Sequence, residues 1–315
     1  MANGGKKTKK RSGRPGGRPQ GRPRRATARD WIGGARLRTL TLGVVPVLLG
    51  SAVAYVDGGW DLGIAVLALA VAVFLQVGVN FSNDYSDGVR GTDRYRVGPA
   101  RVTGAGIAKP RTVLTVALTF FGLAAVAGIV IVVLTGYWWL LAVGAAAIVA
   151  AWFYTGGKRP YGYNALGEVF VFVFFGLVAV LGTEFVQIGK ITVNGWVAAV
   201  MAGFFSCAVL MVNNIRDIGE DRLAGKKTLA VVLGRAGART LYVAFLLLPY
   251  VALVWFVVFY FRTGYTYFTL LLAGPAAIIG ATSQKPRELI TALQLSSFSA
   301  LVFGIVLTVT LALQP

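Results

Sequence analysis

Long apolar segments alternate with short polar segments along the chain from about residue 39 to its end. Each apolar segment approaches the roughly 20 residues that a helix needs to cross the hydrocarbon core of a bilayer. The pattern therefore predicts an all-α polytopic membrane protein with about nine transmembrane helices. The predicted spans are 39–56, 62–82, 112–135, 137–154, 164–188, 194–214, 240–261, 265–281 and 289–313.

Composition supports this fold class and excludes several kinds of site. The 315 residues are 56% hydrophobic and only 14% charged, which is unlike a water-soluble domain of this length. The chain has no histidine, and its single cysteine, Cys207, lies in an apolar segment. An intrachain disulfide, a structural zinc site and a histidine-based catalytic triad are therefore excluded, whereas carboxylates that bind oxygen-seeking cations remain.

Residues 1–29 form a separate region by composition. They contain eleven Lys or Arg, no acid and many Gly and Pro, so they cannot bury enough apolar surface to fold. We expect a disordered basic tail, followed by a transmembrane domain over residues 30–315. Such a tail can bind anionic lipid or nucleic acid, or it can act only as a topology signal. We favour the topology signal and expect no nucleic-acid partner.

Positive charge is distributed very unevenly between the two sides of the predicted membrane domain. Of the 31 Lys and Arg, only Lys190 and Arg262 lie in loops on one side, and the other 29 lie in the tail or in loops on the opposite side. The positive-inside rule places the N-terminus and the basic loops in the cytoplasm of a bacterial-type plasma membrane, with the C-terminus outside. The predicted cytoplasmic loops are 83–111, 155–163, 215–239 and 282–288.

Two clusters of polar and acidic residues follow predicted spans that run in the same direction. The first cluster covers residues 83–93 and the second covers residues 213–221, and together they hold five aspartates among the twelve acids of the chain. The negative end of a helix dipole disfavours a carboxylate by roughly 0.3 to 1 kcal/mol, so acids at this place need cations. Two such clusters at one membrane face therefore predict a shared ligand.

The spacing of the acids indicates which ligand this is. Within each cluster the polar residues lie three or four positions apart, so a helix presents them on one face. Such carboxylates can hold Mg²⁺ together with substrate phosphates, and nearby cations can hold the phosphate oxygens. Alternatively, the acids only neutralise basic loops, but two parallel clusters favour a site. We predict Asp84, Asp87, Asp93, Asp217 and Asp221 as metal ligands, Asn83, Asp84, Asp87, Asp217 and Asp221 as catalytic residues, and Arg94, Arg101, Arg216 and Lys226 as phosphate ligands.

The two clusters resemble the aspartate-rich motifs of the UbiA-type intramembrane aromatic prenyltransferases, although Asp93 follows Asp87 by six residues instead of the usual four. Further strings at 154–157, 160–163 and 226–229 are most similar to the branch that prenylates 1,4-dihydroxy-2-naphthoate in menaquinone biosynthesis. The resemblance implies Mg²⁺-dependent transfer of a polyprenyl chain from its diphosphate to the naphthoate ring. The ring carboxylate is lost and demethylmenaquinone is formed.

This chemistry suggests further substrate contacts. Aromatic faces can shield an allylic cation from water, and Tyr154 and Tyr163 follow the fourth predicted span. Glu168 either binds the acceptor or only stabilises the start of a helix. Arg36 and Arg38 bind the diphosphate or the acceptor carboxylate unless they only flank a span, and Lys158 is a further candidate for that carboxylate. The remaining predicted contacts are Asn213 and Asn214 of the second cluster.

Two other functions remain open from the sequence. A transporter would place acids or broken helices near the middle of its spans. Here the acids gather at one face, which favours a central cavity that is open to the cytoplasm for a soluble acceptor and open sideways to lipid for a polyprenyl tail. Within the enzyme class, 4-hydroxybenzoate is the alternative acceptor.

Overall fold

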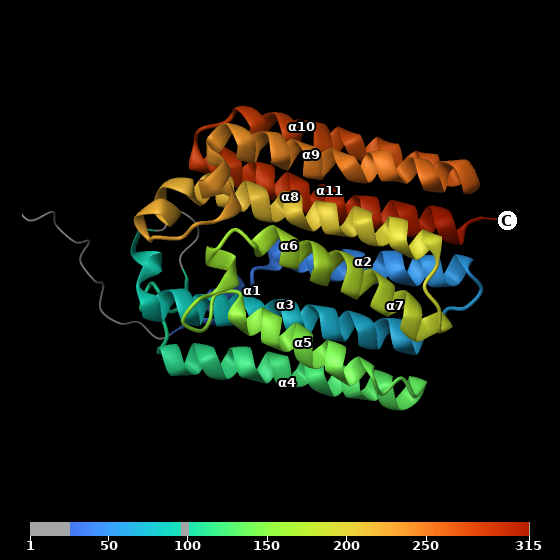
Figure 1. Ribbon diagram of the computed structural model, residues 1–315, viewed down its shortest axis with the longest axis horizontal. Helices are drawn as coiled ribbons and strands as arrows, with labels where there is room; N and C mark the ends of the chain where they lie inside the picture. The colour runs from blue at the N-terminus through green and yellow to red at the C-terminus, as the bar shows by residue number, and fades with distance from the viewer. Residues whose placement is uncertain (1–25, 96–100, 315) are drawn as a thin grey trace, which may run out of the picture.

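The computed structural model describes residues 26–95 and 101–314, and the chain forms one bundle of long helices (Figure 1). Within this part the structure has no β-strand, only one isolated bridge between Asn164 and Lys227, so the prediction of an all-α fold is confirmed. The helices are α1 (Ala28–Ala35), α2 (Leu37–Val56), α3 (Leu62–Arg90), α4 (Pro110–Thr135), α5 (Leu140–Phe153), α6 (Gly167–Val171), α7 (Ala179–Ile188), α8 (Val193–Leu223), α9 (Leu229–Phe259), α10 (Leu270–Thr282) and α11 (Pro286–Ala312).

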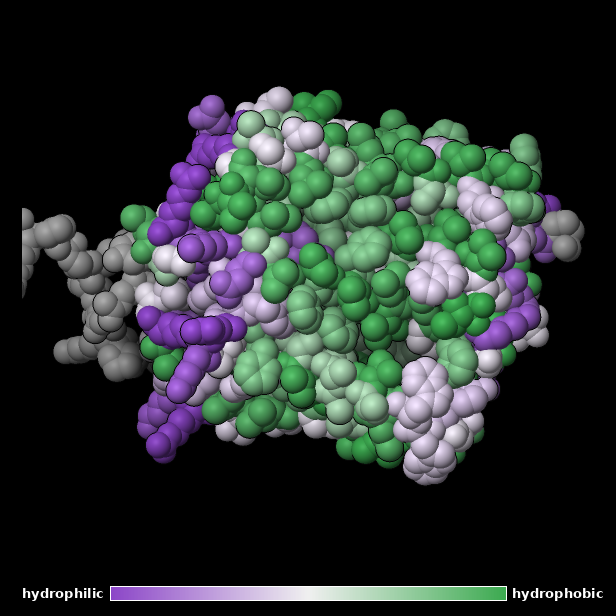
Figure 2. Space-filling model, in the orientation of Figure 1, coloured by the Kyte–Doolittle hydropathy of each residue, from purple (hydrophilic) through white to green (hydrophobic). Residues whose placement is uncertain are grey.

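Every predicted span coincides with helical structure. Eight helical segments of the described chain are long and apolar enough to cross a membrane, and α5 is a shorter apolar helix of 14 residues. A wider π-helical stretch at Phe172–Val178 joins α6 to α7, so Gly167–Ile188 forms one span. Apolar side chains cover the flank of the bundle in Figure 2, and hydrophilic ones gather mainly at the end where α3 and α8 terminate.

The ends of the spans differ from the prediction at the acidic clusters. The predicted loop 215–239 is wrong, because α8 continues to Leu223 and α9 begins at Leu229. In the same way α3 continues to Arg90, eight residues beyond its predicted end at residue 82. The polar residues at the ends of both helices lower the local hydropathy, so the sequence predicts loops there. Many of these residues are nevertheless buried on the inner face of the helix, and the helix continues. Both acidic clusters therefore start on rigid helices.

The N-terminal end of the described chain is a short helix. Residues 1–25 of the predicted tail lie outside the described residues, and α1 begins at Ala28, inside the predicted range of the tail. Thr27 and Asp30 start α1 with a reciprocal capping box. Arg36 then adopts a left-handed conformation, with φ of 54°, and turns the chain from α1 into α2.

The packed core lies among α2, α8, α9 and α11. Tyr242, Phe205, Phe256 and Phe303 are its largest fully buried aromatic side chains. Figure 1 shows α8 to α11 on one side of the bundle and α3, α4 and α5 on the other side, with α2, α6 and α7 between them. The space between the core and α3 to α5 is the place where a pocket forms.

Candidate functional site

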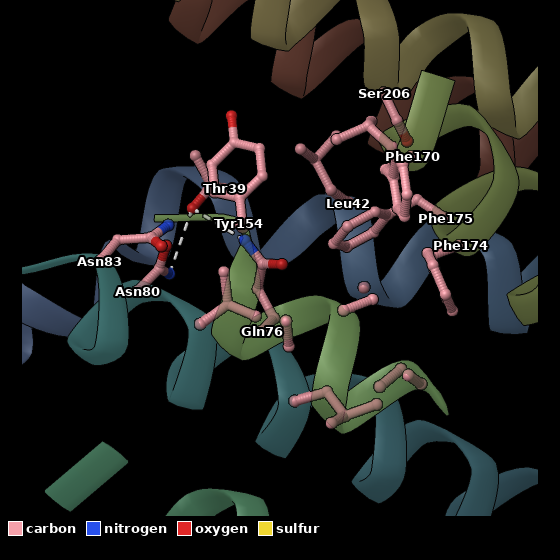
Figure 3. A pocket seen from close by; sticks show the side chains of 18 of the residues that line it. Thr39, Leu42, Gln76, Asn80, Asn83, Tyr154, Phe170, Phe174, Phe175 and Ser206 are labelled. Carbon is pink, nitrogen blue, oxygen red and sulfur yellow. Dashed lines mark hydrogen bonds between the residues drawn. The ribbon is translucent and has the colours of Figure 1, made fainter. Parts of the chain in front are cut away.

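A large pocket of about 880 Å³ extends into the bundle between α2, α3, α4, α5, α8 and the segment from α6 to α7. Its polar end lies where α3 and α8 terminate, and its other end is lined by apolar and aromatic side chains. Figure 3 shows part of this wall, with Asn83, Asn80 and Tyr154 at one end and Phe170 and Phe174 at the other. The pocket therefore joins a polar chamber to an apolar channel.

Asp87 is the most heavily contacted residue of the first cluster. It lies on the last turn of α3 and is 1% exposed. The Arg101 guanidinium and the Tyr163 hydroxyl both donate to its carboxylate, and Lys226 Nζ lies 3.4 Å from its Oδ2. Asn83, one turn earlier, accepts a hydrogen bond from Thr155 Oγ1 at 2.7 Å. Two loops and the turn before α9 thus meet at the end of α3.

Asp84 makes a different kind of contact from Asp87. Its two carboxylate oxygens accept hydrogen bonds from the backbone amides of Val102 and Thr103, at 2.7 and 2.8 Å. These bonds anchor the segment that presents Arg101, whose Nη1 also donates to the backbone oxygen of Asn83 at 2.9 Å. The sequence predicts Asp84 as a metal ligand, but its contacts are those of a residue that holds a loop in place.

The second cluster is organised largely by its own helix. Arg216 pairs with Asp217 at 2.6 Å and donates to Asn213 Oδ1 at 2.8 Å. Asp221, one turn after Asp217, accepts a hydrogen bond from Thr228 Oγ1 at 3.4 Å. All four residues of α8 named here line the pocket.

Lys226 joins the two clusters. Its Nζ lies 3.4 Å from Asp87 and 3.9 Å from Asp221, residues that are 134 positions apart in the chain. The same ammonium lies 4.6 Å from the centre of the Tyr163 ring, at the distance of a cation–π contact. Acids from both predicted motifs therefore face one pocket.

The protonation states of Arg101 and Tyr163 follow from their burial beside carboxylates. Burial alone would lower the pKa of Arg101, but the carboxylates of Asp87 and Asp93 raise it above its ordinary value, so the guanidinium stays charged. Burial and the neighbouring Asp87 carboxylate raise the pKa of Tyr163. The Tyr163 hydroxyl therefore remains a hydrogen-bond donor at neutral and moderately alkaline pH.

Several other predicted residues also line the pocket. Arg36 and Arg38 lie at the start of α2, and Tyr154 follows α5. Asn214 lines the pocket on α8 and donates through Nδ2 to Glu168 at 3.0 Å. Substrates that enter from the polar end would meet these residues.

The remaining predicted residues lie elsewhere. The described residues that line the pocket do not include Glu168, Lys158 or Asp93. Glu168 is buried behind Asn214, Lys158 is exposed, and Asp93 pairs with Arg101 at 3.4 Å. The first two are therefore corrections to the predicted substrate contacts, because neither side chain reaches the pocket. The side chain of Arg94 lies outside the described residues.

Sequence reasoning missed some polar residues of the pocket wall. Thr39, Gln76 and Asn80 line it next to Asn83. Residues 76, 80, 83 and 87 are spaced by four, three and four, which is one face of a helix. That spacing inside an apolar span was a readable signal. Arg90 was also missed, and it donates to the backbone oxygens of Thr155 and Gly157.

The pocket offers the donor set that Mg²⁺ prefers. Carboxylate and amide oxygens from both clusters converge on it, and sulfur or imidazole ligands are not needed. No group of three metal-binding side chains gathers within the described residues. This fits an ion that takes one or two protein carboxylates and completes its shell with water and substrate phosphates.

Comparisons with known proteins agree with this arrangement. The profile of the UbiA prenyltransferase family matches residues 43–289. The chain is 43% identical over 304 residues to 1,4-dihydroxy-2-naphthoate octaprenyltransferase of Mycobacterium tuberculosis, which covers 91% of this chain and 98% of that protein. It is 35% identical over 249 residues to the Escherichia coli protein of the same name, which covers 77% and 81% of the two chains.

Solved structures share the fold. The apo structure of a UbiA homologue from Aeropyrum pernix has a TM-score of 0.66 and 16% identity, and it covers 85% of this chain and 97% of that chain. A UbiA homologue from Archaeoglobus fulgidus bound to GPP and Mg²⁺ has a TM-score of 0.61 and 14% identity, with coverage of 88% and 99%. The family match and the eight apolar helical segments show that the chain is an integral membrane prenyltransferase, and it belongs to the UbiA prenyltransferase family.

Proposed function

We propose that this enzyme transfers a polyprenyl chain from its diphosphate to 1,4-dihydroxy-2-naphthoate. The observation that carries the proposal is the position of Lys226, whose ammonium lies within 4 Å of one carboxylate from each aspartate motif. Such a site suits a diphosphate held between two acidic clusters. The acceptor is taken from the relatives, which are named for this naphthoate and span nearly the whole chain.

Asp87, Asp217 and Asp221 would hold Mg²⁺, with Asn83 next to them. All four residues line the pocket at the ends of two rigid helices. Bound Mg²⁺ supplies Lewis-acid neutralisation of the diphosphate, which stabilises the charge that develops on the leaving group. This role also offsets the repulsion between carboxylates at the negative ends of α3 and α8.

Arg101 and Lys226 would bind the diphosphate oxygens. Both already face the cluster carboxylates, so a diphosphate bound at these carboxylates would lie next to their donors. Charge stabilisation of this kind is strongest where water is excluded, and Asp87 and Arg101 are both buried. Arg216 is held by Asp217 and Asn213, so its predicted phosphate contact requires the release of one of these bonds.

The apolar channel would hold the polyprenyl tail, and Tyr154 would shield the allylic cation. The bond between C1 and the diphosphate oxygen breaks, a carbon–carbon bond to the naphthoate ring forms, and CO₂ and diphosphate leave. The electron pair of the bond between the ring and the carboxylate stays with the ring when CO₂ leaves, so the product is a quinol. Arg36 and Arg38, at the pocket entrance, would hold the acceptor carboxylate before it is lost.

The orientation of the enzyme follows from charge. We place the ends of α3 and α8 in the cytoplasm of a bacterial-type plasma membrane and the C-terminus outside. The 29 to 2 distribution of Lys and Arg supports this orientation. Labelling of residue 223 from the cytoplasm, and of residue 313 only from outside, would test it.

The direct test of function is turnover by purified protein in lipid. Radiolabelled polyprenyl diphosphate should label 1,4-dihydroxy-2-naphthoate in the presence of Mg²⁺, with release of CO₂ from a carboxyl-labelled acceptor. A parallel reaction with 4-hydroxybenzoate should be much slower. Faster turnover of 4-hydroxybenzoate would replace the proposed acceptor, and no turnover of either acid would contradict the proposal.

A further inference from the structure

A polar group lies in the pocket wall at a depth that the metal and the diphosphate do not explain. Gln76 lies eleven residues before Asp87, so it is about 16 Å away along α3 at ~1.5 Å per residue. It lines the pocket and is 5% exposed. Figure 3 shows it between the polar side chains of Thr39 and Asn80 on one side and the apolar Leu42 on the other. An amide in this environment requires a reason.

The orientation of the Gln76 amide is fixed by Thr39. Gln76 Nε2 donates to Thr39 Oγ1 at 3.4 Å, and the Thr39 hydroxyl donates in turn to the backbone oxygen of Arg36 at 3.0 Å. Because the Thr39 hydrogen is used in this way, Thr39 accepts from Gln76 and faces its nitrogen. The carbonyl oxygen, Oε1, then points away from Thr39 (Figure 3) and is buried in the wall of the pocket.

Gln76 Oε1 has no hydrogen-bond partner in the described part of the chain. A buried carbonyl without a donor is unfavourable, and most such groups in proteins find a partner. The partner that this oxygen lacks must donate a hydrogen. The pocket wall thus presents one unused acceptor.

Only one of the proposed substrates can satisfy it. A polyprenyl chain has no hydrogen-bond donor, and an ionised diphosphate has only acceptors. The dihydroxy aromatic acceptor has two O–H donors. We propose that Gln76 Oε1 accepts a hydrogen bond from one ring hydroxyl of the acceptor, and this assignment of a subsite rests on the proposed function.

The surroundings of Gln76 agree with such a subsite. Arg36, Arg38 and Thr39 lie within about one turn at the start of α2, and Thr39 contacts the Gln76 amide of α3. Asn80 Nδ2 donates to the backbone oxygen of Ala35 at 2.8 Å and holds the junction of α1 and α2 against α3. The acceptor would then lie with its carboxylate toward the entrance and a hydroxyl toward Gln76.

The consequence is discrimination among acceptors. A site built to hydrogen-bond a hydroxyl rejects an analogue that lacks it, because the polar group of the site remains unpaired. The test compares Gln76→Leu with the wild-type enzyme. Two deoxy analogues, each lacking one ring hydroxyl, are measured as competitive inhibitors, so that binding is separated from ring reactivity.

We expect the wild-type enzyme to bind one deoxy analogue at least about tenfold more weakly than the dihydroxy acid. Gln76→Leu should raise the KM of the acceptor by a similar factor and bind that analogue and the dihydroxy acid almost equally. The KM of the polyprenyl diphosphate and the Mg²⁺ dependence should stay within about twofold of the wild-type values. Gln76→Asn, which keeps an amide, should retain part of the discrimination.

Ser206→Ala is the matched control. Ser206 lines the same pocket, but its hydroxyl oxygen already takes part in a hydrogen bond, which it donates to the backbone oxygen of Ala202 at 2.9 Å. This variant should keep the wild-type discrimination. Unchanged discrimination in an active Gln76→Leu enzyme would overturn the subsite alone, as would an equal rise in KM for both substrates. Absence of turnover by the wild-type enzyme would contradict the proposed function itself.

Discussion

The two acidic clusters reach the same pocket by different routes. At the end of α3, Asp87 depends on contacts from distant segments, namely Arg101, Tyr163 and Lys226. At the end of α8, Asp217 is held by its immediate neighbour Arg216. One cluster is thus shaped by the tertiary fold and the other mainly by its own helix.

This difference predicts which substitutions will disturb other residues of the site. A change near α3 alters the loops that bring Arg101 and Tyr163 into place, because Asp84 and Asp87 accept hydrogen bonds from these loops. A change at Asp217 removes its own charge and its pair with Arg216, which lies on the same helix. We therefore expect substitutions of the first cluster to affect more kinetic parameters than substitutions of the second.

The largest effect is expected for Asp87→Asn. The substitution keeps the size of the side chain but removes the charge that Mg²⁺, Arg101 and Lys226 all require, so kcat should fall by about 10³-fold or more. Excess chelator should abolish turnover by the wild-type enzyme to a similar extent. Asp61→Asn is the control, because Asp61 caps the other end of α3 and Asn is an equally good cap. Near wild-type activity of Asp87→Asn would contradict the assigned role.

A smaller effect is expected for Asp84→Asn. This variant tests whether Asp84 holds the loop in place or binds the metal. One of the two backbone bonds to Val102 and Thr103 would be lost, so Arg101 would be less well placed. We expect a loss of about 10² in kcat/KM for the diphosphate, since a charge-stabilising group would be misplaced. The concentration of Mg²⁺ that gives half-maximal activity should not change. A large increase in that concentration would show that Asp84 binds the metal.

Lys226→Ala tests the group between the clusters. Loss of one charge-assisted contact should lower kcat/KM for the polyprenyl diphosphate by about tenfold, with a smaller change for the acceptor. Lys227→Ala is the matched control, since that side chain is exposed and does not line the pocket. Equal losses for both substrates would indicate that Lys226 has only a structural role.

The smallest effect is expected outside both clusters. Removal of residues 1–25 should change kcat by less than about twofold, because none of the residues assigned to the site lies in this segment. The amount of inserted enzyme is measured in parallel, since the positive charge can affect orientation. A correctly inserted truncated enzyme that loses most of its kcat would show that these arginines contribute to catalysis.

Hydropathy was sufficient to predict the helices but not their ends. The apolar segments specify nine helical regions because length and composition decide whether a helix can cross a bilayer. The polar ends of α3 and α8 lower the local average, although an inner face continues to pack. For this reason the predicted loops after α3 and α8 begin too early, and the first turns of α9 were predicted as loop.

The spacing of acids identified the clusters but not the partner of each residue. Asp84 and Asp87 lie on the same face of α3, so spacing alone gives them the same role. Their roles differ because residues 101–103 pack against this face, where Arg101 binds Asp87 and the amides of Val102 and Thr103 bind Asp84. Glu168 begins a span, as predicted, yet it faces Asn214 and not the pocket. Gln76 was accessible to the same reasoning about spacing, and its importance emerges only when the pocket is known.

The claim that both clusters act as one site is tested most directly by a double-mutant cycle. The kcat of Asp87→Asn, Asp217→Asn and the combined variant is measured at saturating substrates and Mg²⁺, with equal amounts of inserted enzyme. If the two carboxylates hold one metal–diphosphate unit, the combined variant should lose only a few-fold more than the worse single variant. If the two losses multiply, the clusters act independently, and the account of a shared site is contradicted.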